Sequence, residues 1–236
     1  MLFAILLGLT IARTETANLP SYFPKCYQDD PKINECFVNA ANSLNQYVRK
    51  GIPEIGLRPL DPFVAPPFTM TLESPITDYN ATLRGFTFER LFNYQFISAE
   101  IRPKDGVVGG KLILPDLDLK SNYTVEGHII NLPLQGGGYF KIANSKIVCD
   151  FLTSGWQEKK NCNGINLEIT CKIEDLKVNI TGLANDMVGT LLNLSSQLVA
   201  SELSPAYTNI FRPFLKSFLT RMCRKHEFDD LFPLTP

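Results

Sequence analysis

The central part of the chain, from Phe68 to Ile180, alternates apolar and polar residues as β-strands with one buried face do. The clearest run spans residues 117–129, where one parity is apolar and the other polar; the apolar positions are Leu117, Leu119, Tyr123, Val125 and Ile129. Near Glu174 and Asp175 the apolar residues change parity, which predicts a β-bulge. The pattern therefore indicates an antiparallel sheet that has one dry face and is strongly curved.

From Leu183 to Met222 the pattern becomes helical. One apolar face comprises Met187, Leu191, Leu194 and Leu198, and Val188, Leu192 and Val199 broaden it. Pro205 and Pro213 each remove a helical hydrogen bond, so we expect a kink or a break near Ser204. A long apolar helix thus follows the strands.

A shorter helix is predicted before the strands. Asp30 followed by Pro31 is a typical helix start, and Gly51 can end the helix. Residues 51–63 contain three prolines, which predict a stiff, non-helical connector. The order of elements is a short helix, many strands and a long helix, which places the chain in the α+β class.

The N-terminal residues and the sequons indicate secretion. Residues 1–17 have the short apolar run and small residues of a signal peptide, and residues 18–236 are expected to form a single domain. Three sequon asparagines fall on the polar sides of predicted strands, where a glycan would be tolerated: Asn80, Asn122 and Asn179. The sequon at Asn193 lies on the apolar helix and is expected to be unused unless that position faces outward.

The six cysteines agree with an oxidising compartment. Cys26 and Cys36 could close a loop of roughly ten residues, which would contribute about 3 kcal/mol. Cys149 and Cys171 each lie on the apolar side of a strand and could pair across a hairpin. Cys162 and Cys223 are then either bonded to each other or free. No CxxC spacing is present, so a zinc site is not expected.

The chain is poor in residues that support catalysis. It has two histidines, His128 and His226, and both are expected to be solvated. No nucleophile, metal or phosphate-binding motif is present, so we expect neither an enzyme nor a cofactor. The net charge of −1 argues against nucleic acid or a strongly anionic membrane as partner. After the leader no apolar run suits stable membrane insertion, and we expect a monomer.

Several short segments resemble the takeout and juvenile hormone binding protein family of insects. They are Leu19-Pro20-Ser21-Tyr22, Cys26, Asp30-Pro31, Cys36, the stretch 51–63 and the closing segment Phe228-Asp229-Asp230-Leu231-Phe232-Pro233. The resemblance implies the Cys26–Cys36 disulfide and a curved antiparallel sheet wrapped around the long C-terminal helix, with an apolar tunnel beside it. It also implies an extracellular carrier in haemolymph, whose ligand is juvenile hormone, a related terpenoid or a fatty-acid-like lipid. Arg58, Cys162 and Cys223 depart from the family pattern.

The ligand would lie between the dry strand face and the helix. The residues expected to line it are Tyr123, Val125, Ile129, Leu191, Leu194 and Leu198, with the Tyr123 hydroxyl as the polar group that orients the ligand. A filled core remains an alternative for each position. Two other functions remain open: a secreted signalling or interaction protein without a ligand, and a lipid-transfer protein of the wider fold group.

Overall fold

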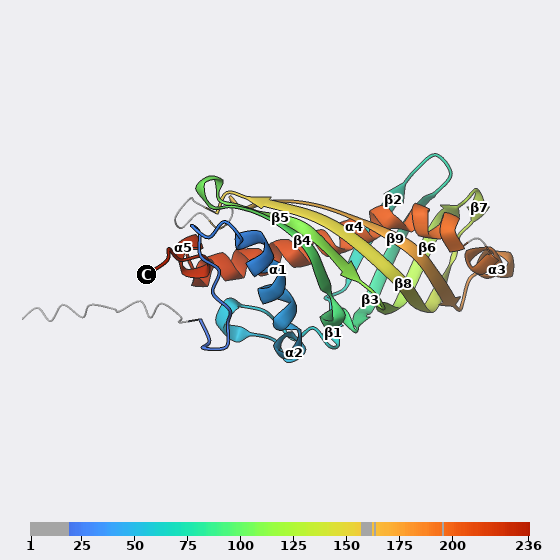
Figure 1. Ribbon diagram of the computed structural model, residues 1–236. Coiled ribbons are helices and arrows are strands. Elements are labelled where there is room, and N and C mark those ends of the chain that lie inside the picture. Colours follow the sequence, from blue (N-terminus) through green and yellow to red (C-terminus); the bar gives the residue numbers. More distant parts are fainter. Residues whose placement is uncertain (1–18, 157–161, 163, 195) are drawn as a thin grey trace, which may run out of the picture.

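The computed structural model describes residues 19–156, 162, 164–194 and 196–236. The predicted signal peptide, residues 1–17, lies outside the described residues. The molecule is elongated, with α1 and α2 near one end and α3 at the other, and α4 runs along most of its length (Figure 1).

The elements follow the predicted order. The bounds are α1 Ile33–Ser43, α2 Asn45–Val48, η1 Pro53–Ile55, β1 Phe63–Val64, β2 Phe68–Glu73, β3 Asp78–Glu89, η2 Leu91–Asn93, β4 Gln95–Arg102, η3 Pro103–Asp105, β5 Val107–Leu114, β6 Asp118–Ile129, β7 Leu132–Pro133, β8 Gly136–Ser154, β9 Asn166–Ile180, α3 Asp186–Leu194, α4 Ser196–Lys225 and α5 Phe228–Leu231.

The described strands form one antiparallel sheet with the order β1-β3-β6-β8-β5-β4, in which β2 also pairs with β3, β7 with β6 and β9 with β8. The long strand β8 organises the sheet. Its first half pairs with β6 and its second half with β5, while β9 follows its other edge over nearly the whole length. The predicted α+β architecture, a large antiparallel sheet with a long C-terminal helix, is confirmed.

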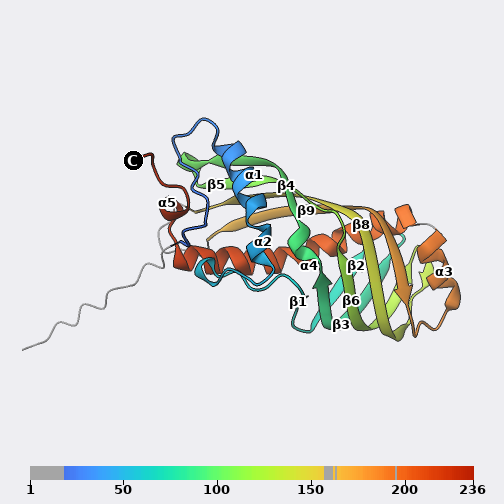
Figure 2. The same ribbon diagram turned by 60° about the horizontal axis from the view of Figure 1, so that its bottom comes forward.

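Bulges curve the sheet and change which side chains face inward. The register between β8 and β9 moves from Asp175 opposite Lys146 to Ile173 opposite Ile147, so Glu174 has no opposite residue and the predicted bulge is confirmed. A second irregularity, in β3 between Arg84 and Thr87, was not predicted. Figure 2 shows the resulting curvature, with the sheet bending around α4.

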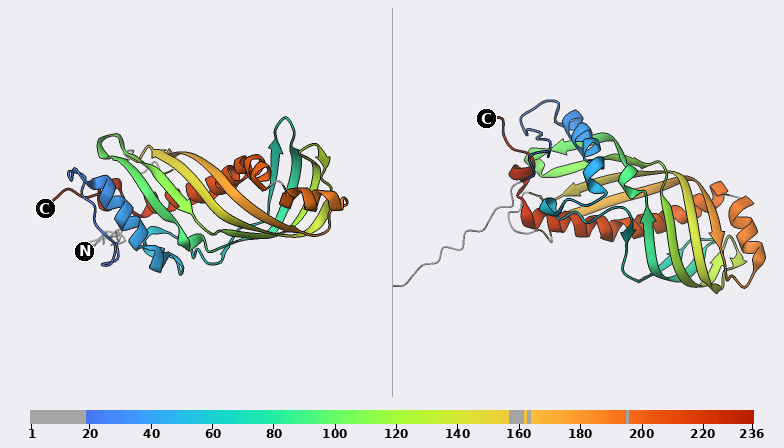
Figure 3. Two further views of the ribbon diagram at one scale, coloured as in Figure 1. Left: turned by 45° about the vertical axis from the view of Figure 1, so that its right-hand side comes forward. Right: turned by 90° about the horizontal axis from the view of Figure 1, so that it is seen from below.

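The helix α4 lies against the free edge and the dry face of β9 (Figure 3). Two of its hydroxyls accept hydrogen bonds from β9 amides: Ser204 Oγ from Ile173 N at 3.1 Å, and Thr208 Oγ1 from Cys171 N at 2.9 Å. Of the kink or break expected near Ser204, the break is wrong, because α4 continues through Pro205. The bonds to β9 hold this part of the helix in place where the proline removes a main-chain bond.

The N-terminal segment is fastened to the rest of the protein by α1, α2 and a disulfide. Cys26 and Cys36 are bonded, as expected, and Cys149 is bonded to Cys171 between β8 and β9. Cys162 is bonded to Cys223, which joins the segment after β8 to the end of α4. The connector 51–63 was expected to be non-helical but includes the 3₁₀ turn η1, in which Pro53 takes the first helical position.

An apolar cavity between the sheet and α4

An apolar cavity of about 120 Å³ lies between the dry face of the sheet and the first half of α4, near α3. Its walls come from β2, β3, β6, β8, β9, α3, α4 and the segment after β7. The lining residues are Met70, Tyr79, Ala81, Leu83, Phe86, Leu119, Tyr123, Val125, Ile129, Leu134, Phe140, Ile142, Val178, Ile180, Leu192, Leu203, Ala206, Tyr207 and Ile210. None of these side chains carries a charge.

Strand periodicity explains how the sheet supplies this lining. Alternate residues of a strand share one face, so Tyr79, Ala81 and Leu83 of β3 point inward together, as do Tyr123 and Val125 of β6. Ala81 lies directly opposite Val125 in the ladder. Small side chains at Ala81 in the sheet and Ala206 in α4 leave space between the two layers.

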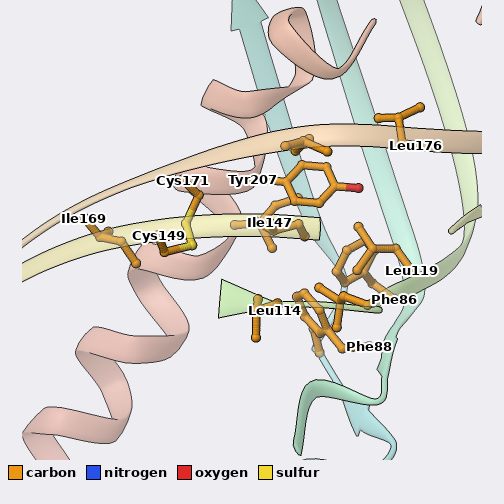
Figure 4. Packing of buried hydrophobic residues seen from close by; sticks show 14 of the residues in the cluster. Phe86, Phe88, Leu114, Leu119, Ile147, Cys149, Ile169, Cys171, Leu176 and Tyr207 are labelled. Atoms are coloured by element: carbon orange, nitrogen blue, oxygen red, sulfur yellow. A yellow bond between two sulfur atoms is a disulfide. The ribbon is translucent and has the colours of Figure 1, made fainter. Parts of the chain in front are cut away.

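A cluster of aromatic rings closes the cavity toward the C-terminal half of α4. This phenylalanine cluster consists of Phe63, Phe68, Phe86, Phe88, Phe211 and Phe214, whose neighbouring ring centroids lie 4.9–6.5 Å apart. Phe86 belongs both to the cluster and to the cavity lining. Figure 4 shows Phe86 and Phe88 packed beside Leu119 below Tyr207. The cluster therefore bounds the depth of the cavity on this side.

The irregularity in β3 places two of these rings inside. Tyr79, Ala81 and Leu83 are buried at odd positions, and after Gly85 the buried positions become Phe86 and Phe88. Gly85 has a φ of +65°, a conformation that glycine adopts without a steric penalty. The change of parity brings both rings into the core. Sequence reasoning missed it, although the alternation around Gly85 carried the signal.

Three tyrosines are the only lining residues with polar side-chain atoms. The Tyr123 hydroxyl donates to the carbonyl oxygen of Thr181 at 2.8 Å. The Tyr207 hydroxyl donates to Asn144 Oδ1 at 2.9 Å, and Asn144 Nδ2 donates to the carbonyl oxygen of Leu117 at 2.8 Å. Burial raises the pKa of all three phenols, so they are neutral at physiological pH.

Tyr79 differs from the other two tyrosines. It is 7% exposed, and its hydroxyl makes no hydrogen bond within the described part of the chain. Besides burial, the nearby Tyr79 contributes to the raised pKa of Tyr207, so the two phenols are close to each other. Tyr79 is thus a hydrogen-bonding group without a partner on an apolar wall.

The structure brings together only part of the expected site. Tyr123, Val125 and Ile129 lie on the cavity wall. On the helical side the expectation is corrected: Leu194 is 80% exposed, Leu198 is 42% exposed, and neither these two nor Leu191 lines the cavity. The buried helical face instead contains Val188, Leu192, Val199, Ala206, Tyr207 and Ile210.

The sequence offered two apolar faces, and the other one is buried. Within α3 alone, Met187 and Leu194 are exposed, whereas Val188 and Leu192 are buried. The role of Tyr123 also changes, since its hydroxyl is already bonded to Thr181. Tyr79 and Tyr207 were missed. Tyr79 belongs to a recognised strand alternation, and Tyr207 follows Leu203 by one helical turn, so both were detectable as inward-facing.

The histidines lie away from the cavity lining. His128 is exposed, as expected, whereas His226 is only 3% exposed. His226 Nε2 lies 3.0 Å from the carbonyl oxygen of Glu54, so the expectation of a solvated side chain is corrected for this residue. Its position directly after α4 packs it against η1. Among the described residues no cluster of potential ligands could hold a metal ion.

The sequon asparagines differ in their surroundings. Asn80, Asn122 and Asn179 are exposed on the outer face of their strands. Asn193 is also exposed, but its Nδ2 donates to the carbonyl oxygens of Val178 at 2.9 Å and Gly189 at 3.0 Å. Within the described residues no helix is both long and apolar enough to cross a bilayer.

The comparisons with known proteins agree with this geometry. The sequence matches the family model described as haemolymph juvenile hormone binding protein over residues 2–233. The crystal structure of Takeout 1 from Epiphyas postvittana is similar in fold, with a TM-score of 0.74, 19% identity, and coverage of 89% of this chain and 100% of that chain. A lipopolysaccharide binding protein structure gives a TM-score of 0.30 at 12% identity, covering 82% of this chain and 38% of that one, which carries no argument. No curated protein is similar enough in sequence to count as a match.

Proposed function

Because the chain belongs to the haemolymph juvenile hormone binding protein family, we propose that it is a secreted carrier that encloses a hydrophobic small molecule between its sheet and α4. The family description names binding, and catalysis plays no part in the proposal. Juvenile hormone, a related terpenoid or another lipid of similar shape is the candidate ligand. The cavity is the observation that carries the proposal.

The lining suits an apolar ligand. Its side chains are aliphatic or aromatic apart from three hydroxyls, and two of these are already paired. Removing apolar surface from water contributes about 25 cal/mol per Å². Water in such a site would find few polar partners, so an entering ligand would displace few tightly bound water molecules. Enclosure is therefore the source of affinity.

The cavity volume limits what can enter without rearrangement. Pockets for drug-sized ligands hold about 300–1,000 Å³, and this cavity holds about 120 Å³. A terpenoid or long acyl chain would have to displace lining side chains. Met70 and Leu203 are only partly buried, and methionine adapts to many shapes. We propose that ligand entry widens the cavity at these side chains.

Secretion is supported by the cysteines. Every described cysteine is in a disulfide, which suits an oxidising compartment. Asn80, Asn122 and Asn179 are exposed and would accept glycans there. These features agree with a carrier in extracellular fluid.

The test is native mass spectrometry of the protein secreted from insect cells, followed by solvent extraction. We expect a complex with one copurifying or added apolar molecule, and loss of that mass on extraction. A protein that is empty and also rejects added terpenoids and fatty-acid esters would contradict the proposal. That outcome would favour the alternative of a secreted signalling or interaction protein that acts through its surface and has no ligand.

A further inference from the structure

We propose that the Tyr79 hydroxyl is the hydrogen-bond donor that selects the ligand, and that the ligand presents a neutral oxygen acceptor to it. This inference rests on the proposed function and specifies the chemistry of the same cavity. Ketones, esters, ethers and alcohols belong to the class that would be accepted. Carboxylates and pure hydrocarbons are disfavoured.

A comparison of the hydrogen bonds made by the three lining hydroxyls assigns this role to Tyr79. Tyr123 donates its proton to Thr181, and Tyr207 donates its proton to Asn144. Each phenol has one proton to donate. Tyr79 alone among the three has a donor without an acceptor in the described residues. A ligand oxygen placed against this unpaired hydroxyl would gain a hydrogen bond that no described protein group supplies.

Strand pairing fixes the position of Tyr79. It lies between Leu72 of β2 and Gly127 of β6 in the ladder. Gly127 has a φ of +134°, and a Cβ added there would be 2.6 Å from the Tyr79 Cα. The absence of a side chain at Gly127 therefore allows β6 to approach the backbone of Tyr79 closely. The Tyr79 hydroxyl is therefore carried by a β-strand and not by a loop.

The charge of the lining decides between acceptor classes. The described lining residues include no lysine, arginine or histidine. An ionised carboxylate would lose its hydration and meet no cation, which is far more costly than burying a neutral carbonyl. The raised pKa of Tyr79 keeps its proton in place at physiological pH. A neutral acceptor satisfies the site without these costs.

The experiment uses probes that differ in one group. Acetophenone and α-methylstyrene have nearly the same shape but carry C=O and C=CH₂ respectively, and benzoate supplies the carboxylate. Binding of each is measured by calorimetric titration for the wild-type protein, Tyr79→Phe and Tyr123→Phe, with melting temperatures as a check on folding. Tyr123→Phe is the matched control, because its hydroxyl is already paired.

We expect Tyr79→Phe to weaken acetophenone binding by roughly 3- to 10-fold, the effect of one hydrogen bond, and to leave α-methylstyrene unchanged. Tyr123→Phe should affect the two probes alike, and benzoate should bind more weakly than acetophenone. Equal effects of Tyr79→Phe on both neutral probes would overturn the inference while leaving the carrier function intact. If neither neutral probe bound the wild-type protein, the inference would also be overturned, whereas the carrier function would fail only if the native mass spectrometry test failed.

Discussion

Asn193 of α3 forms two hydrogen bonds with the main chain of Val178 in β9: its Oδ1 accepts from the amide at 3.1 Å and its Nδ2 donates to the carbonyl oxygen at 2.9 Å. Ser204 and Thr208 of α4 bind further amides of the same strand edge. β9 pairs on its other side with β8. Helical side chains therefore take the place of a neighbouring strand along this edge.

The Asn193 pair can be tested by Asn193→Ala. The variant loses the bonds to Val178 and Gly189, and the higher helix propensity of alanine offsets part of the loss. We expect the free energy of unfolding to fall by about 1–2 kcal/mol. Urea denaturation measures it.

The matched control is Asn179→Ala, which also removes a sequon but lies on the exposed side of β9. Its free energy of unfolding should stay within about 0.5 kcal/mol of the wild-type value. Equal losses in both variants would mean that the bonds to Val178 add no stability.

Gly127→Ala should destabilise the protein by more than about 1 kcal/mol, because φ is +134° and the new Cβ would collide with the backbone of Asp78 and Tyr79. Gly189→Ala in α3 is the contrasting variant. The nearest atom to its Cβ is Ile180 Cγ2 at 3.9 Å, so we expect a gain of about 0.5–1 kcal/mol. Thermal unfolding compares the two. Losses of similar size in both would refute this account of the β3–β6 contact.

Two of the disulfides should differ in their contribution to stability. Cys162–Cys223 spans a sequence separation of 61 and Cys26–Cys36 one of 10. Loop entropy gives about 4 kcal/mol for the first and about 3 kcal/mol for the second. Double alanine variants of each pair, compared by chemical denaturation, should show the larger loss for Cys162 and Cys223. The reverse order would show that loop length does not govern their effect.

Residue patterns predicted much of the fold because the alternation of apolar and polar residues along a strand is a local property of the sequence. Strand alternation identified the dry face that includes Tyr123, Val125 and Ile129, and the parity change located the bulge at Glu174. The position of Cys149 and Cys171 on the apolar sides of their strands made their pairing possible, and the two are bonded. These features depend on residues close in sequence.

Features that depend on tertiary packing were not predictable in this way. The broad apolar surface of residues 183–222 offered two candidate faces, and only the contact with β9 buries the face of Leu192 and Val199 instead of that of Leu194. Hydrogen bonding between distant segments decided the role of Tyr123, since its acceptor Thr181 lies beyond β9. The burial of His226 likewise depends on η1.

The central claim is that ligands occupy the cavity beside α4, and filling that cavity tests it most directly. Ala206→Phe places a ring on the lining, whereas Leu194→Phe adds one at an exposed position near the same end of the molecule. Both variants are titrated with the fluorescent apolar probe N-phenyl-naphthylamine, after their melting temperatures show that they fold. We predict that Ala206→Phe binds at least about tenfold more weakly than the wild-type protein, equivalent to about 1.4 kcal/mol, while Leu194→Phe binds like the wild-type protein. Undiminished binding by a folded Ala206→Phe would contradict the account.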